Sequence, residues 1–270
     1  MSSLLSRCRT RHPFTIRRST NIPHAAYRHP FVFGVSLALI ACCAIPSGAC
    51  AGGRKKGNVQ AKQTKVETEE MRVTVSGSEV YCLAAGPKDG HPILLMHGAR
   101  FDAHTWLTTN TIQDLVTAGY RVFAIDIPGF SHSPRATLYA NSFTDTLLGE
   151  LTKEPAIIVT PSLSGRFGFP PAIASSPKVA GWVAVAPAAM DYHKDNITKI
   201  KLPTLIIWGS KDAIFPVAQA DVLAKAIAGS KKVVLEGANH PCYLDKPEQF
   251  NKEIMDFAAS VFRERKTEQK

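Results

Sequence analysis

AIIVTPSLSG, residues 156–165, is an apolar run that ends in a serine-rich turn. We predict that a buried strand here turns sharply into a helix, because the apolar run is followed at once by turn-forming residues. A strained strand-to-helix turn exposes a serine above an α/β sheet, and it needs small residues two positions before and two positions after that serine. Ser162 has Thr160 and Ser164 at those positions, whereas Ser164 would have Arg166 at the second. The pattern favours Ser162 as a nucleophile over the commoner role of a serine that caps a helix.

Short apolar runs and amphipathic stretches alternate from Glu67 onward at spacings typical of βα units. We predict an opening antiparallel pair of strands at 71–75 and 79–84. Six buried, mostly parallel strands are predicted at 92–96, 121–127, 156–159, 181–186, 204–208 and 232–235, and helices at 111–118, 141–151, 165–175, 217–228 and 247–263. Right-handed crossovers would place these helices on both faces of one doubly wound sheet. The fold class is therefore α/β, with ligand sites expected at the carboxyl ends of the strands.

Two more polar residues follow the ends of later strands. Asp212 lies four residues past one predicted strand, and His240 lies five residues past the next. Loops at one sheet edge can bring such side chains together, because adjacent strands are only about 4.8 Å apart. The order Ser162, Asp212, His240 is that of α/β-hydrolases, in which the histidine takes the serine proton and the carboxylate orients the histidine. Asp191, after the preceding strand, is a second candidate for the acid.

A glycine turn, His97-Gly98-Ala99-Arg100, follows the strand predicted at 92–96. We expect the backbone N–H groups of Ala99 and Leu163 to stabilise the oxyanion of a tetrahedral intermediate. His97 is interpreted as a buried structural residue beside this turn. The later turn at 126–131, DIPGFS, is interpreted as a scaffold.

Only residues 187–201 lie between two of the predicted strands where larger enzymes of this kind insert a lid. Fifteen residues make at most a small flap. We therefore predict no substantial lid domain and an open, shallow pocket that favours small acyl groups. Met190 or Tyr192 could still add apolar lining.

Neither cysteine nor histidine content indicates a metal or cofactor site. Beyond residue 66 the chain has only Cys82 and Cys242, which leaves room for at most one disulfide and for no Cys-x-x-Cys motif. Six histidines lie in the same region, and none forms a paired metal-binding motif. We expect no cofactor and no metal, which argues against a metal hydrolase. Ser162 argues against a dehalogenase, whose nucleophile is a carboxylate.

The net charge of +10 is concentrated at the start of the chain. Residues 1–66 contain 11 Lys and Arg and no acid. The rest of the chain, from residue 67 onward, therefore contains 21 of the 32 basic residues and all 22 acidic residues. The folded part is therefore close to neutral. A nucleic-acid partner is not expected.

Residues 1–51 have the features of a secretory signal. A basic start is followed by uncharged residues 31–45 and then by small residues around Ala49 and Ala51. We predict a signal peptide or an N-terminal membrane anchor formed by residues 29–53, with the protein exported (secreted or periplasmic) or membrane-anchored. An organelle transit segment is the alternative. Residues 52–66 would be a linker and residues 67–265 the catalytic domain.

Four motifs resemble one family: HGAR at 97–100, DIPG at 126–129, PSLSG at 161–165 and GANHPCYLDKPE at 237–248. Over about residues 67–263 the chain is similar to the α/β-hydrolase domain-containing protein 14 family. The resemblance implies an α/β-hydrolase fold with Ser162 as nucleophile, Asp212 as acid and His240 as base. Thr160 departs from the serine usual in the family. The resemblance also implies esterase-like activity and, from one cytosolic member described as moving acetyl from protein lysine to coenzyme A, a candidate acyl acceptor.

These observations predict a serine hydrolase that cleaves small acyl esters, or acyl groups on accessible carriers such as acetyl-lysine. An exported enzyme would meet little coenzyme A, so water is the expected acceptor. The alternatives are a non-catalytic binding protein of the same fold and an acetyl transferase to coenzyme A. Besides its acyl substrate, the protein is expected to associate with a membrane through its N-terminal segment.

Overall fold

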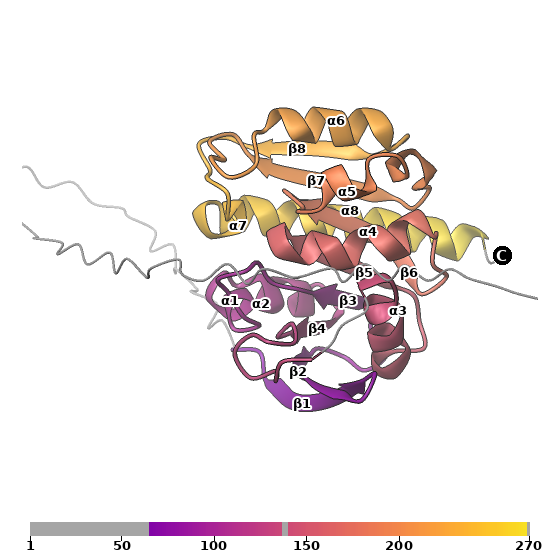
Figure 1. Ribbon diagram of the computed structural model, residues 1–270. Helices are drawn as coiled ribbons and strands as arrows, with labels where there is room; N and C mark the ends of the chain where they lie inside the picture. The colour runs from indigo at the N-terminus through magenta and orange to yellow at the C-terminus, as the bar shows by residue number, and fades with distance from the viewer. Residues whose placement is uncertain (1–64, 137–139, 269–270) are drawn as a thin grey trace, which may run out of the picture. The chain divides into compact units, whose positions relative to one another are not determined.

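The computed structural model describes residues 65–136 and 140–268, and its strands form one eight-stranded sheet (Figure 1). The strand order is β1-β2-β4-β3-β5-β6-β7-β8. β1 and β2 are antiparallel to their neighbours, and all later pairings are parallel. The strands are β1 (Thr68–Val75), β2 (Ser78–Ala85), β3 (Pro92–Leu95), β4 (Arg121–Ile125), β5 (Ala156–Pro161), β6 (Val179–Val185), β7 (Thr204–Gly209) and β8 (Lys231–Leu235).

Helices cover both faces of the sheet (Figure 1). The helices are α1 (Thr105–Thr108), α2 (Thr111–Thr117), α3 (Ala140–Leu151), α4 (Gly165–Ile173), α5 (Met190–His193), α6 (Ala218–Ala226), α7 (Cys242–Asp245) and α8 (Pro247–Glu268). Two single 3₁₀ turns, η1 (Ser162–Ser164) and η2 (Ile197–Lys199), complete the set. Apolar side chains of α3, α4 and α6 pack in one core layer, and those of α2 and α8 pack in the other.

The central strands read as unbroken apolar runs because both of their faces are covered. Every residue of β5, β6 and β7 is buried, which is typical of parallel strands between two helical layers. The first strand instead alternates toward its end, where Val73 and Val75 point inward. The predicted α/β class is therefore confirmed: one mixed, mostly parallel sheet lies between two layers of helices.

The sequence predicted no substantial lid domain, and the segment between β6 and β7, all of which the structure describes, carries none. This segment contains only the one-turn helix α5 and the turn η2. This segment therefore places no inserted domain over the carboxyl end of β5.

The two cysteines of the folded part lie in different core layers. Cys82 packs on the α3, α4 and α6 side of the sheet, and Cys242 packs on the α2 and α8 side. Both are free and buried, so the bridge that the sequence allowed does not form. Burial raises the pKa of each thiol to about 12, which keeps both as unreactive thiols.

The predicted signal or anchor, including residues 29–53, and most of the predicted linker lie outside the described residues. Val66 is already tied to the fold, because its N–H donates to Gln113 Oε1 at 2.9 Å. At the other end, α8 runs to Glu268, past the predicted domain end at 265. Within residues 65–136 and 140–268, none of the helices combines the length and apolar character needed to cross a membrane.

Candidate active site

Three loops at the carboxyl edge of the sheet bring Ser162, His240 and Asp212 into one hydrogen-bonded chain. Ser162 follows β5, Asp212 follows β7 and His240 follows β8. His240 Nε2 lies 2.8 Å from Ser162 Oγ, and His240 Nδ1 lies 2.7 Å from Asp212 Oδ2. Both distances are those of hydrogen bonds. The arrangement joins a hydroxyl, a base and an orienting carboxylate in the order that nucleophilic catalysis requires.

The backbone at Ser162 is strained and is held in place from outside. Its φ of 51° places a non-glycine residue in the left-handed region, which costs about 1–3 kcal/mol. The Ser162 carbonyl accepts a 2.8 Å hydrogen bond from the N–H of Ala188, on the loop after β6. A Cβ on Gly165 would lie 2.5 Å from Pro187 Cβ, so the same loop packs against the start of α4. This contact fixes the sharp turn that presents the hydroxyl.

The neighbouring serine has a structural role. Ser164 is fully buried, and its Oγ donates to the carbonyl of Pro161 at 2.8 Å. Ser162, by contrast, is partly exposed and faces His240. The structure therefore brings Ser162, and not Ser164, to the base.

Thr160 uses its hydroxyl in the core below the turn. Trp182 Nε1 donates to Thr160 Oγ1 at 2.8 Å, and both residues are fully buried. The two residues lie on neighbouring strands, β5 and β6. A hydroxyl at position 160 therefore satisfies an indole N–H that would otherwise have no partner in the apolar layer.

We expect Thr160→Val to lower the free energy of unfolding by about 1–3 kcal/mol, because it leaves the buried Trp182 N–H without an acceptor. Chemical unfolding followed by tryptophan fluorescence measures this loss. Thr160→Ser keeps the hydroxyl and is the matched control, with a smaller loss than Thr160→Val. Equal stability of Thr160→Val and the unmodified protein would show that the hydrogen bond contributes nothing.

Asp212 is held so that one oxygen binds the backbone and the other binds His240. Its Oδ1 accepts hydrogen bonds from the N–H groups of Ile214 and Phe215, each at 2.8 Å, and its carboxylate side chain is fully buried. Its Oδ2 faces His240 Nδ1. This places the imidazole proton on Nδ1 and leaves Nε2 free to accept the serine proton. Asp191, the alternative acid, is exposed on α5 and is not the partner of His240.

The turn after β3 lies against the nucleophile. A Cβ built on Gly98 would lie 3.6 Å from Ser162 Cβ, so the backbone of this turn approaches the serine closely. Among the described residues, neither the N–H of Ala99 nor that of Leu163 donates to a hydrogen-bond acceptor. Both N–H groups are therefore without an acceptor among these residues, and their role as an oxyanion hole stays a prediction.

His97 and Asp126 stabilise this turn from behind. His97 is fully buried; its Nδ1 donates to the carbonyl of Gly98 at 2.8 Å, and its Nε2 accepts from the N–H of Ile127 at 2.9 Å. Burial lowers the pKa of His97, which keeps the ring neutral for these two bonds. Asp126 Oδ1 accepts from the N–H of Ala103 at 2.7 Å. Both residues therefore act as scaffold, in agreement with the sequence interpretation.

A pocket of about 400 Å³ opens over Ser162 and His240. Its walls are mostly apolar and include Phe101, Ile214 and Tyr243, none of which the sequence patterns indicated. Tyr243 lies on the one-turn helix α7 just after His240, and burial raises the pKa of its hydroxyl, so this group stays protonated. Tyr192 lines a neighbouring cavity of about 470 Å³ instead.

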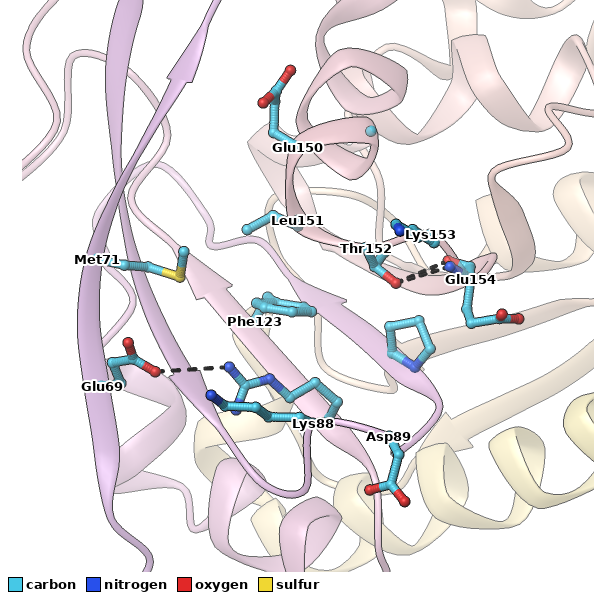
Figure 2. Close-up of a pocket in the computed structure, with 14 residues that line it drawn as sticks. Glu69, Met71, Lys88, Asp89, Phe123, Glu150, Leu151, Thr152, Lys153 and Glu154 are labelled. Carbon is cyan, nitrogen blue, oxygen red and sulfur yellow. Dashed lines mark hydrogen bonds and ion pairs between the residues drawn. The ribbon is translucent and has the colours of Figure 1, made fainter.

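The described part of the chain has a larger cavity, of about 600 Å³, at the opposite edge of the sheet. Figure 2 shows Lys88, Asp89, Glu150 and Glu154 around it, with apolar side chains between them. It lies at the first residues of β3 and β4, far from the carboxyl ends of the strands, and contains no candidate catalytic residue. The smaller pocket over Ser162 is therefore the candidate active site. Over the same described stretches, no group of His, Cys, Asp and Glu side chains is arranged to hold a metal ion.

Comparisons with known proteins agree with this fold. Residues 93–194 match the family described as "Alpha/beta hydrolase family", and residues 158–247 match "alpha/beta hydrolase fold". The human "Putative protein-lysine deacylase ABHD14B" is 35% identical over 204 residues, which span 71% of this chain and 96% of that protein. Human "Protein ABHD14A" is 33% identical over 171 residues, 61% of this chain and 63% of that protein.

Solved structures share the same fold. A predicted CIB-like hydrolase from Thermoplasma acidophilum has a TM-score of 0.68 and 30% identity, with 72% of this chain and 98% of that chain covered. The carboxylesterase CesB from Bacillus subtilis has a TM-score of 0.64 and 17% identity, over 73% of this chain and 94% of that chain. The second likeness concerns the fold alone.

Proposed function

Because this chain belongs to the ABHD14 family of α/β-hydrolases, we propose that it is a serine hydrolase acting on small acyl groups. Its substrates would be small acyl esters, or acyl groups on accessible carriers such as acetylated lysine. The observation that carries the proposal is the hydrogen-bonded chain from Ser162 Oγ through His240 to Asp212, at 2.8 and 2.7 Å. A purely binding role would not require this order of hydroxyl, base and carboxylate.

In the proposed reaction, Ser162 Oγ attacks the acyl carbonyl carbon as His240 Nε2 takes the hydroxyl proton. The resulting oxyanion accepts hydrogen bonds from the N–H groups of Ala99 and Leu163. Asp212 stabilises the imidazolium, which then gives its proton to the leaving oxygen or nitrogen as the bond to the carbonyl carbon breaks. Water then attacks the acyl-enzyme with His240 as base, and the acid and free Ser162 are released.

Two observations support small acyl groups and an accessible carrier. The pocket over Ser162 has a volume of only about 400 Å³, and the described segment between β6 and β7 adds no lid domain. In addition, the relative ABHD14B carries a name that describes a protein-lysine deacylase. Water is the proposed acyl acceptor.

A fluorophosphonate probe, which reacts with activated serines, tests the proposal directly. We expect the probe to label the unmodified protein and to leave Ser162→Ala unlabelled, because the phosphorus is attacked by Ser162 Oγ once His240 accepts its proton. Ser164→Ala is the matched control and should be labelled like the unmodified protein, since the buried Ser164 hydroxyl donates to Pro161 and not to the pocket. Failure of the correctly folded, unmodified protein to react would exclude a serine hydrolase.

A further inference from the structure

The pocket over Ser162 contains one permanently charged side chain, that of Arg100. No Asp or Glu is among the described residues that line this pocket. The lining residues are Gly98, Ala99, Arg100, Phe101, Pro161, Ser162, Val185, Ile214, His240, Pro241 and Tyr243. The pocket therefore has one positive charge, on an exposed side chain, beside largely apolar walls.

Arg100 has no partner of its own among the described residues. Its side chain is exposed, and its guanidinium forms no hydrogen bond or ion pair with any residue of the described stretches. Two other arginines of the fold are engaged: Arg72 donates to the carbonyl of His132 at 2.6 Å, and Arg121 donates to the carbonyl of Gly86 at 2.9 Å. The guanidinium of Arg100 is thus available to a ligand.

The nearby carboxylates are already occupied. Asp102, two residues along the chain, accepts from the N–H of His104 at 3.0 Å. Asp212 has its two oxygens bound to His240 and to two backbone N–H groups. Neither carboxylate forms an ion pair with Arg100, so the positive charge is not neutralised from within the site.

The position of Arg100 links this charge to the substrate. Arg100 directly follows Ala99, whose N–H is a proposed oxyanion donor, and the turn that holds both residues lies against Ser162. The proposed chemistry itself needs no further cation, because the backbone N–H groups bind the oxyanion and His240 moves the proton. The guanidinium is therefore free to contact a bound substrate.

We infer that Arg100 selects substrates that carry a carboxylate near the reacting carbonyl, and specifically dicarboxylic acyl groups over neutral acyl groups of equal length. The planar guanidinium of arginine binds a carboxylate through two parallel hydrogen bonds. The inference rests on the proposed function, since it names the class of acyl group that Ser162 would accept.

The test compares 4-nitrophenyl hydrogen adipate with 4-nitrophenyl hexanoate, which have six-carbon acyl chains that differ in the terminal carboxylate. We expect Arg100→Gln to lower the ratio of kcat/KM for adipate over hexanoate about tenfold, the effect of one charge-assisted hydrogen bond. The kcat/KM of Arg100→Gln for hexanoate should stay within about twofold of that of the unmodified protein. Arg100→Lys should keep part of the preference for adipate over hexanoate, because lysine retains the positive charge but cannot form two parallel hydrogen bonds with a carboxylate.

Arg166→Gln is the matched control. Arg166 is also exposed and lies four residues after Ser162, but it lines the neighbouring cavity and not the pocket over Ser162. Its substitution should leave the adipate-to-hexanoate ratio unchanged. A second pair, 3-acetoxybenzoate and phenyl acetate, places the carboxylate on the leaving group. If Arg100→Gln lowered the relative kcat/KM for the carboxylate-bearing substrate in this second pair alone, Arg100 would recognise the leaving group and not the acyl group, and the inference would be wrong.

Two other outcomes would overturn the inference. Arg100→Gln could slow adipate and hexanoate equally, which would make Arg100 a general contributor to catalysis, or it could change neither. These outcomes differ from a failure of the proposed function, which Ser162→Ala reveals by itself. If Ser162→Ala hydrolyses hexanoate as fast as the unmodified protein, the proposed serine mechanism is wrong. This conclusion does not depend on the adipate-to-hexanoate ratio of the Arg100 variants.

Discussion

Replacing His240 by alanine is expected to lower kcat for a neutral 4-nitrophenyl ester by roughly 10⁵- to 10⁶-fold, the loss seen when a serine hydrolase loses its base. The reason is geometric: His240 Nε2, 2.8 Å from Ser162 Oγ, is the titratable group positioned to take the serine proton. Without it the hydroxyl remains a weak nucleophile. Steady-state hydrolysis, with thermal unfolding to verify the fold, measures this change.

Asp212→Asn gives a second, sharper test of the same arrangement. The amide oxygen can still accept from the N–H groups of Ile214 and Phe215, so the loop keeps its bonds. The amide NH₂ then faces His240 Nδ1 and forces the imidazole proton onto Nε2, toward Ser162. We expect kcat to fall about 10⁴-fold while the fold is unchanged.

His91→Ala serves as the control for these losses. His91 stacks on Phe262, with ring centroids 4.3 Å apart, at the opposite edge of the sheet, and it touches no site residue. Its removal should leave kcat within about twofold. If folded His240→Ala kept kcat within tenfold of the unmodified protein, the proposed role of His240 as base would be wrong.

Gly209→Ala is expected to be the most destabilising single-methyl change considered, with a loss of about 3 kcal/mol or more and a fall in Tm of about 10 °C. Gly209 is the last residue of β7, and it pairs with Leu235 of β8. A Cβ there would overlap the backbone carbonyl oxygens of Ala238 and Asn239. These belong to the loop that carries His240, so relieving the clash must move this loop or the end of β7.

The neighbouring hydrogen bonds make that movement costly. Ser210 N–H donates to the carbonyl of Leu235 at 3.1 Å, and Lys211 N–H donates to the carbonyl of Ala238 at 2.8 Å. Differential scanning calorimetry and ester turnover at 25 °C would measure the two effects separately. A variant with unchanged Tm and unchanged kcat would contradict the close packing of these loops.

Gly149→Ala is the matched control for Gly209→Ala. At this site in α3 a new Cβ would meet only the flexible end of the Lys178 side chain. Alanine has a higher helix propensity than glycine by about 1 kcal/mol, so this change should be neutral or stabilising. The contrast between two identical methyl additions isolates the backbone clash at Gly209.

The sequence predicted the central strands well because they are buried on both faces. Unbroken apolar runs such as those of β5 and β7 stand out from the amphipathic helices around them, and each predicted strand is present in the structure. The three polar residues were found by the same logic, since Ser162, Asp212 and His240 follow the ends of predicted strands by three, four and five residues.

The remaining contacts depend on packing that no local pattern encodes. The one-turn helix α7 is too short to show a helical period, so Tyr243 gave no signal as a pocket residue. The hydrogen bond from Trp182 to Thr160 joins residues 22 positions apart, and it depends on how β5 and β6 are paired in the sheet. The allowed disulfide was excluded only by the sheet, which separates Cys82 from Cys242.

The long spacing of the candidate catalytic residues has a consequence for refolding. Ser162 and His240 lie 78 positions apart and His240 and Asp212 lie 28 apart, so no local segment can form the hydrogen-bonded chain. The sheet between β5 and β8 must first be complete, and such long-range pairing forms late because loop closure is entropically costly. Recovery of ester turnover after dilution from denaturant would therefore time the closure of the last parallel strands, whereas recovery of helical circular dichroism would report earlier, local events.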